Sequence, residues 1–363
     1  MAVKTRADLV LFGTTLGLVA MGLLMTFSAS ALVAHETHRS SFFFLARQSV
    51  WAALGTSSML AAMRLDYRKL NHRGVLYASL GITVVLLTVV LALPAIKGSH
   101  RWIRWGIFSF QPSEFAKLTL VLYLAHQLER RLDRLEQLRT GIMGALVIPT
   151  VLVALVLVEP DVGTAFCLGA VAFVSFFVAG VPLRHLAGIG LATVPVLILF
   201  ITRVRYVVVR LLAFVDPWSD PLGAGFQLIQ SLIAVGTGGL FGLGFMQSKQ
   251  KLFYLPEPHT DFVFSVISEE FGFAGAISVL ALFSVILWRG LHVAGRAPDA
   301  FGTLLAAGLT SVVVVQAYIN VGVVLGLLPT TGIPLPFISA GGSSMVVSLT
   351  AIGLVLSVSQ HAR

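Results

Sequence analysis

Long apolar runs separated by short charged loops are the feature that most constrains how this chain can fold. A helix needs about 20 residues to cross the hydrocarbon core of a bilayer, and runs of that length recur along the sequence. Of the 363 residues, 57% are hydrophobic and only 11% are charged, which excludes a soluble globular protein. Backbone polar groups in lipid must be paired within each segment, so the sequence predicts an all-α polytopic membrane protein.

We expect about ten transmembrane helices in a single domain that covers residues 1–363. The predicted spans run at roughly 9–34, 43–63, 74–95, 111–128, 140–158, 162–180, 186–202, 262–288, 300–328 and 340–360. The longest polar segment, residues 203–261, is predicted to be a loop between the seventh and eighth spans. The sequence shows no internal repeat, and its single cysteine, Cys167, excludes an internal disulfide.

Basic residues concentrate on alternate loops. One set of loops holds most of them, whereas the short loops opposite hold only Arg39, Arg47, Lys97, Arg101 and Arg104. The positive-inside rule then places both termini in the cytoplasm, which requires an even number of spans. Loop 97–110 and segment 203–261 would face outward. The net charge of +9 is explained by this topology, so no nucleic-acid partner is expected.

Ionisable side chains within the apolar runs are the first candidates for a functional site, because inserting one into a membrane costs about 2.5–3.5 kcal/mol. Asp261 ends the polar stretch 254–262, where water meets apolar surroundings. That setting can raise the pKa of a carboxyl group toward the range of a useful base. The alternative is that Asp261 caps the helix that begins near Phe262.

Two further pairs of ionisable residues lie in predicted spans. Glu114 and Lys117 open the fourth span, and their i,i+3 spacing places them on one helix face. They form either a self-neutralising pair near the interface or part of a site. Glu269 and Glu270 lie deeper in the eighth span, and we interpret them as groups that hold helices together, with Lys117 as the candidate partner.

Positive charge on the outward side opposes the topology rule and therefore predicts an anionic ligand. The outward cations are Arg101, Arg104, Arg203, Arg205, Arg210, Lys249 and Lys251. Glycine-rich stretches at 236–244 and 340–344 allow either close backbone approach to an anion or close helix packing. A basic outward cleft at the membrane suits an amphipathic, phosphate-bearing lipid, whether that lipid is a substrate for synthesis or a cargo for transport.

Six separated motifs, spread in order over nearly the whole chain, resemble the SEDS family of shape, elongation, division and sporulation proteins. They are Gly98–Trp102, Gln111–Lys117, Asp216–Pro221, Gly225–Gln227, Tyr254–Phe262 and Pro336–Ser344. Within that family, residues 248–261 are more similar to the division-type FtsW proteins and their sporulation relatives than to RodA. In RodA-like members an arginine commonly stands at the position of Pro258.

The resemblance implies a peptidoglycan glycosyltransferase that polymerises lipid II on the outer face of the bacterial cytoplasmic membrane. It also implies a class B penicillin-binding protein and other divisome proteins as partners. The essential aspartate of the family falls on Asp261, and acidic and basic residues of its fourth span fall on Glu114 and Lys117. A lipid II flippase, a RodA-like elongation polymerase and a non-catalytic scaffold are the alternatives.

Our mechanistic hypothesis makes Asp261 the base that accepts the proton of the acceptor sugar's 4-hydroxyl. Candidates to stabilise the departing diphosphate are Arg101, Arg210, Lys249 and Lys251. His259 is a candidate hydrogen-bond partner, and Ser343 is a further candidate cavity residue. A divalent cation, Mg²⁺ or Mn²⁺, on the diphosphate would suit this chemistry, but no ligand cluster in the sequence indicates one, and no other cofactor is expected.

Overall fold

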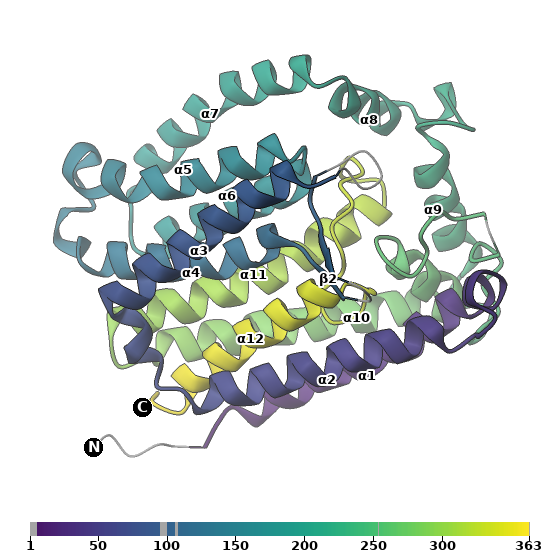
Figure 1. Cartoon of the computed structure of the whole chain (residues 1–363), viewed down its shortest axis with the longest axis horizontal. Coiled ribbons are helices and arrows are strands. Elements are labelled where there is room, and N and C mark those ends of the chain that lie inside the picture. Colours follow the sequence, from purple (N-terminus) through teal and green to yellow (C-terminus); the bar gives the residue numbers. More distant parts are fainter. Residues whose placement is uncertain (1–5, 95–99, 106–107, 253, 363) are drawn as a thin grey trace.

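The computed structural model describes residues 6–94, 100–105, 108–252 and 254–362. Helices dominate this part of the chain (Figure 1). They are α1 (Leu9–His38), α2 (Phe43–Arg64), α3 (Arg73–Ala92), α4 (Pro112–Glu129), α5 (Met143–Val158), α6 (Val162–Val178), α7 (Leu183–Arg203), α8 (Arg205–Val215), α9 (Phe226–Thr237), α10 (Val263–Gly295), α11 (Ala300–Val324) and α12 (Gly342–Ser359). Outside the described residues lie Lys4, Lys97, Gly98, Ser99 and Arg363, which the topology count or the motifs include.

The predicted helical membrane fold is confirmed. Seven of the described helices are long and apolar enough to cross a membrane, and α6 is an apolar helix of 17 residues. Each of the ten predicted spans coincides with one of the helices α1 to α7 or α10 to α12. The count of ten crossings itself stays a prediction.

Several segments predicted as loops contain short helices or strands. Segment 203–261 contains α8 and α9, of 11 and 12 residues. Loop 97–110 contains a hairpin of β1 (Ile103–Trp105) and β2 (Phe108–Phe110), which pair antiparallel with Ile103 opposite Phe110. Short helical turns also occur at η1 (Tyr67–Asn71), η2 (Leu132–Arg134), η3 (Leu138–Ile142) and η4 (Pro217–Ser219).

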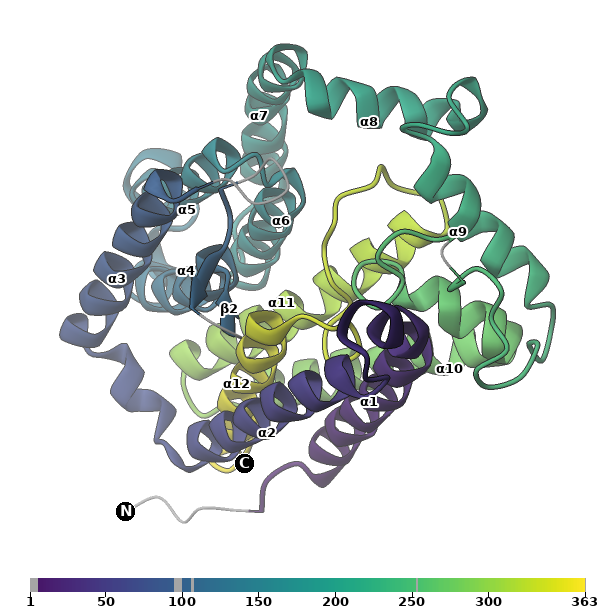
Figure 2. The same cartoon turned by 45° about the vertical axis from the view of Figure 1, so that its right-hand side comes forward.

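Helix α11 forms the centre of the bundle. It packs against α4, α6, α10 and α12, and nearly all of its side chains are buried, as are those of α12. Helices α1 and α2 cover the α12 side, whereas α7 and α8 lie at the periphery (Figures 1 and 2). Most side chains of α7 are exposed on the surface of the bundle, and most of them are apolar. A surface of this kind suits contact with lipid, because a helix that faces hydrocarbon needs no polar face.

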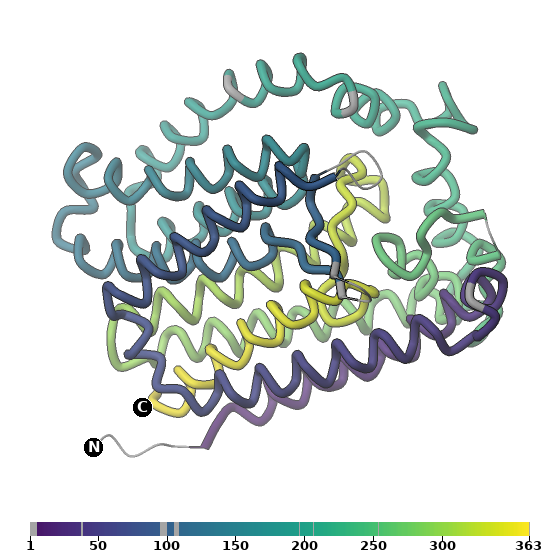
Figure 3. The backbone as a smooth tube through the Cα atoms, in the orientation of Figure 1, coloured from purple at the N-terminus to yellow at the C-terminus, as the bar shows by residue number. Residues whose placement is uncertain are grey.

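The start of α1 and the end of α12 lie at the same end of the bundle (Figure 3). The amide of Asp8 donates to Ser359 Oγ at 3.2 Å, and Arg289 Nη2 lies 2.6 Å from the carboxylate of Asp8. An even number of membrane crossings is consistent with this arrangement.

Helix α10 breaks at Gly272, where φ is 65° and ψ is −159°. This backbone region is essentially restricted to glycine. Amides of the glycine-rich 236–244 stretch donate to the carbonyls of Glu269 and Glu270, and the first two amides after the break donate back to that stretch. The glycines therefore allow close packing against a helix, as one of the two interpretations predicted.

Candidate functional site

Asp261 lies at the end of the 254–262 loop, immediately before Phe262, the residue that caps α10. The N-cap position itself belongs to Phe262, so the interpretation of Asp261 as the N-cap residue is wrong. The side chain is partly buried. The residue therefore stands at the entry of a helix that is buried throughout its first two turns.

Three neighbouring groups hold the main chain around Asp261, and each donates to one of three consecutive carbonyls. They are the Ala340 amide to His259 O (2.9 Å), Ser339 Oγ to Thr260 O (2.5 Å) and Asn320 Nδ2 to Asp261 O (2.8 Å). Each bond gives a carbonyl the partner that it lost when the loop folded away from water. Fixed carbonyls in turn fix the position from which the Asp261 side chain extends.

The loop between α11 and α12 runs beside the Asp261 carboxylate. Gly332 has a φ of 73°, and a Cβ atom at this position would lie 3.4 Å from Asp261 Oδ2. Asn320 Nδ2 also donates to Ile333 O at 2.7 Å. Gly332 of the 328–336 loop therefore lies beside the carboxylate, and Asn320 ties the neighbouring Ile333 to the Asp261 main chain.

The same loop lines a cavity of ≈ 230 Å³ with two guanidinium groups. Arg101 and Arg210 reach it from the 100–105 segment and from α8, together with Thr330 and Thr331. Its apolar walls come from α5, α6, α7, α8 and α11 and from the loop, and include Leu157, Phe166, Leu197, Phe200, Ile201, Val207, Leu211, Ile319 and Leu328. This mixture suits a ligand with an anionic head and an apolar tail.

Main-chain carbonyls orient both guanidinium groups. Arg210 Nη1 donates to Thr330 O at 2.8 Å. Arg101 donates to the carbonyls of Glu159 and Pro160, and its Nη1 lies 3.9 Å from Asp161 Oδ1. The structure thus brings together two of the cations that the sequence predicts for an anion site.

Glu159 is a functional candidate that our sequence reading missed. Its side chain is fully buried, and neither carboxyl oxygen has a hydrogen-bond partner within the described part of the chain. Burial, reinforced by the charge of Asp161 and opposed by Arg101, raises the pKa of Glu159 from 4.5 to about 8. Two acidic residues that flank a proline at the end of an apolar run were the available signal.

Glu114 and Lys117 form an ion pair of 2.8 Å, as their spacing predicts. Each side chain is only 1% exposed. Lys117 Nζ also donates to Gln316 Oε1 at 2.5 Å. The pair is therefore sealed inside the bundle, and it can influence a ligand only through other groups in this conformation.

Lys117 is the wrong partner for the deep acidic residues. Glu270 instead pairs with Lys251 at 2.7 Å, and Lys251 Nζ also donates to Ser28 Oγ at 3.0 Å. Both charges of the pair are buried. Lys251 thereby fastens its loop to α1 and α10, and its predicted contact with a diphosphate stays untested.

Glu269 accepts hydrogen bonds from the turn that precedes Lys251. The donors are the Ser248 hydroxyl at 2.5 Å and the amides of Lys249 and Gln250 at 2.9 and 3.3 Å. The side chain of Lys249 remains exposed. This acidic residue therefore shapes the 248–251 turn, while Lys249 stays available to a ligand.

Two other predicted site residues are buried. The ring of His259 packs 4.7 Å from the ring of Phe44, centroid to centroid. Ser343 Oγ accepts from the Gln111 amide at 3.3 Å, and Gln111 Nε2 donates to Asp161 Oδ2 at 2.9 Å. Ser343 thus connects the start of α12 to the turn that holds Arg101.

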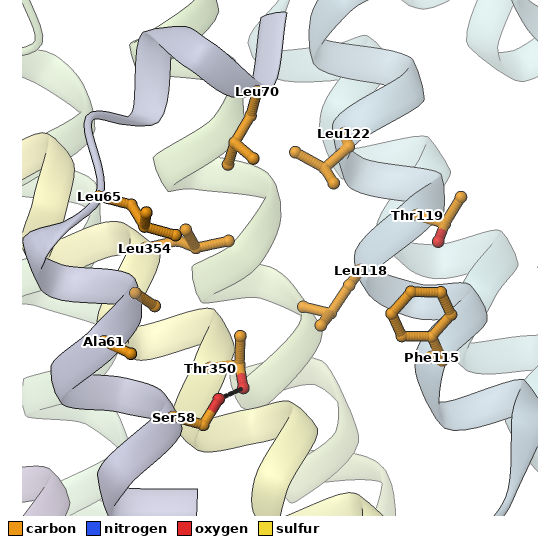
Figure 4. Close-up of a pocket in the computed structure, with 11 residues that line it drawn as sticks. Ser58, Ala61, Leu65, Leu70, Phe115, Leu118, Thr119, Leu122, Thr350 and Leu354 are labelled. Carbon is orange, nitrogen blue, oxygen red and sulfur yellow. Dashed lines mark hydrogen bonds between the residues drawn. The ribbon is translucent and has the colours of Figure 1, made fainter. Parts of the chain in front are cut away.

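A second cavity of ≈ 280 Å³ lies between α2, α4 and α12 (Figure 4). Its lining is almost entirely aliphatic, apart from Phe115, Thr119 and a Ser58–Thr350 hydroxyl pair 2.5 Å apart. None of the predicted site residues lines it. Among the residues that the structure describes, no group of three His, Cys, Asp or Glu side chains could hold a metal ion.

Known proteins resemble this chain over its whole length. The family model for FtsW, RodA and SpoVE, described as a cell cycle protein, matches residues 8–363. The chain is 41% identical to the probable peptidoglycan glycosyltransferase FtsW of Geobacter metallireducens, over 98% of this chain and 95% of that protein. It is 42% identical to the stage V sporulation protein E of Bacillus subtilis, over 99% of each.

Solved structures share the fold. A chain of a peptidoglycan synthase complex, described for its coordination of polymerization and crosslinking, matches with a TM-score of 0.78 at 35% identity, over 97% of both chains. The rod shape determining protein RodA of Thermus thermophilus matches with a TM-score of 0.68 at 31% identity, over 97% of this chain and 96% of RodA.

Proposed function

The chain belongs to the FtsW, RodA and SpoVE family, the SEDS family that its motifs resemble, and from this premise we propose that Asp261 is its catalytic base. The protein is a multi-pass membrane protein and a peptidoglycan glycosyltransferase with a role in cell division or sporulation. The proposed substrate is lipid II, a disaccharide-peptide on a polyprenyl diphosphate.

In the proposed reaction, the Asp261 carboxylate accepts the proton of the acceptor's 4-hydroxyl group. The hydroxyl oxygen attacks the anomeric carbon of the donor, and the bond from that carbon to the diphosphate oxygen breaks. The diphosphate leaves with the bonding electron pair. Because the hydroxyl oxygen attacks from the face opposite the leaving group, the α-linkage of the donor inverts to a β-1,4 linkage. Arg101 and Arg210 stabilise the charge that develops on the leaving group.

One observation carries this proposal: the 328–336 loop touches both halves of the site. Its Gly332 faces the Asp261 carboxylate, while Thr330 and Thr331 line the cavity that contains both guanidinium groups. A base and an anion site on opposite sides of one loop are the two groups that displacement of a diphosphate by a hydroxyl requires. The apolar walls of the cavity suit the first isoprene units of the donor.

The proposed setting is the outer face of a bacterial cytoplasmic membrane, with both termini in the cytoplasm. We further propose a class B penicillin-binding protein as the crosslinking partner, with other divisome proteins around it. The match to a chain of a peptidoglycan synthase complex supports this choice of partner.

Polymerisation of labelled lipid II by the purified protein with its partner tests the base. Asp261→Asn keeps the shape of the side chain but removes the proton acceptor, so we expect about a 10²- to 10⁴-fold loss of rate. Lipid II binding should remain. Glu257→Gln is the matched control, because it removes another carboxylate of the same loop and should leave the rate nearly unchanged. Normal polymer from a folded Asp261→Asn protein would refute the assignment.

A further inference from the structure

Helix α11 carries two buried amide side chains one turn apart. Gln316 and Asn320 have relative exposures of 0% and 1%. Their i,i+4 spacing places them on the same face of the helix. Neither was a candidate in the sequence, because each is a neutral residue inside an apolar span.

Asn320 uses its amide nitrogen twice. Nδ2 donates to Asp261 O at 2.8 Å and to Ile333 O at 2.7 Å. The opposite orientation of the amide would turn its oxygen toward two carbonyl oxygens, so the bonds define which way it points. Asn320 therefore clamps the Asp261 main chain to the 328–336 loop.

Gln316 makes the equivalent connection one turn earlier. Nε2 donates to Pro334 O at 2.9 Å and to Ser344 Oγ at 3.2 Å. Oε1 accepts from Lys117 Nζ at 2.5 Å. The two amides thus bind consecutive carbonyls of the loop, and one of them also binds the sealed Glu114–Lys117 pair.

We propose that Gln316 and Asn320 are positioning residues that couple the buried Glu114–Lys117 pair to the main chain of Asp261. The inference rests on the proposed role of Asp261. The contact path runs from Lys117 through Gln316 to Pro334, and from the adjoining Ile333 through Asn320 to Asp261. Since the Glu114–Lys117 pair does not reach solvent, this path gives it a way to act on the reaction without touching substrate.

Small displacements of a catalytic group are costly: about 1 Å can reduce a rate 10²-fold. Asn320→Ser retains one donor on a shorter side chain, and Asn320→Ala retains none. We therefore expect kcat for lipid II polymerisation to fall in that order, by about 10-fold and then about 10²-fold. KM should change less than kcat, because Asn320 itself does not line the cavity that we assign to the donor.

A double-mutant cycle tests the coupling. Gln316→Met preserves volume while removing both hydrogen-bonding functions, and we combine it with Asn320→Ser. If both act through the loop, the double variant should lose about as much kcat as the more affected single variant. A loss equal to the product of the two single losses would overturn the coupling.

Controls separate this inference from the proposed function. Ser311→Ala removes a buried polar group of α11 whose one hydrogen bond within the described part of the chain stays in its own helix, to Gly308 O, and it should retain full kcat. If the Asn320 variants behave like Ser311→Ala while Asp261→Asn is inactive, the positioning role is wrong and the base assignment stands. If Asp261→Asn is active, the base assignment fails. Retained lipid II binding identifies folded protein in each case, and Asn320→Ser is the variant to use if Asn320→Ala does not fold.

Discussion

At the scale of single residues, Glu159 makes stability depend on pH. Its pKa is raised from 4.5 to about 8 in the folded protein, so the folded state holds a proton that the unfolded state releases between these values. Stability should therefore fall as pH rises from about 5 to about 8, by at most about 1.4 kcal/mol per pH unit, and then level off.

The measurement is the apparent melting temperature in detergent from pH 5 to pH 9, compared with that of Glu159→Gln. The glutamine cannot ionise, so the difference between the two proteins should grow in favour of the variant as pH rises. Asp133→Asn, in the short η2 turn, is a control for general loss of an acid. Parallel curves for Glu159→Gln and its parent would show that Glu159 does not bind the extra proton.

The charged part of the candidate site could be predicted, because charges in apolar sequence are conspicuous. Glu114 pairs with Lys117 at the predicted spacing, and Arg101 and Arg210 do share a cavity. Partners across the bundle could not be predicted, and Lys251 with Glu270 is the example. The number of residues between two side chains shows whether they are neighbours on one helix. A contact between a loop and a distant helix depends instead on tertiary packing, which no local sequence pattern encodes.

At the scale of elements, the break in α10 should tolerate no side chain. A Cβ atom on Gly272 would lie 2.4 Å from the amide nitrogen of Gly242, and the positive φ adds strain. We expect Gly272→Ala to destabilise the protein by about 2 kcal/mol or more. Gly295→Ala, near the end of the same helix with open space around it, should change stability little.

Thermal unfolding in detergent distinguishes these two variants. Equal melting temperatures for Gly272→Ala and Gly295→Ala would mean that the break can close into a regular helix. Gly272→Ala should also lower the rate of polymerisation. The break in α10 sets the positions of Glu269 and Glu270, and these two residues hold the 248–251 turn.

Long helices were predictable and short elements were not. Each span of the sequence is marked by about 20 apolar residues, a signal that exceeds any local preference. Helices α8 and α9 are about half that length, and polar residues interrupt their apolar pattern. Segment 203–261 was therefore predicted to be a loop. The hairpin of β1 and β2 has three residues per strand, which is too few for alternation to be visible.

At the scale of the whole molecule, ten spans and cytoplasmic termini require segment 203–261 to face outward and loop 129–139 to face the cytoplasm. Single cysteines can report this, because the native Cys167 is buried and should react little. Leu222→Cys in the outward segment and Leu132→Cys in the basic loop are matched changes of exposed leucines, at 89% and 42% exposure.

In sealed, right-side-out vesicles, a membrane-impermeant maleimide should label Leu222→Cys at once and Leu132→Cys only after permeabilisation. The physical reason is the cluster of arginines around Leu132, since basic loops are retained on the cytoplasmic side. The opposite labelling pattern would place Asp261 and both cavity arginines on the cytoplasmic side, where a polymerase of the outer face could not use them. Labelling of both cysteines before permeabilisation would place residues 132 and 222 on the same side of the membrane. The chain would then cross the membrane an even number of times between them, and our odd number of spans there would be wrong.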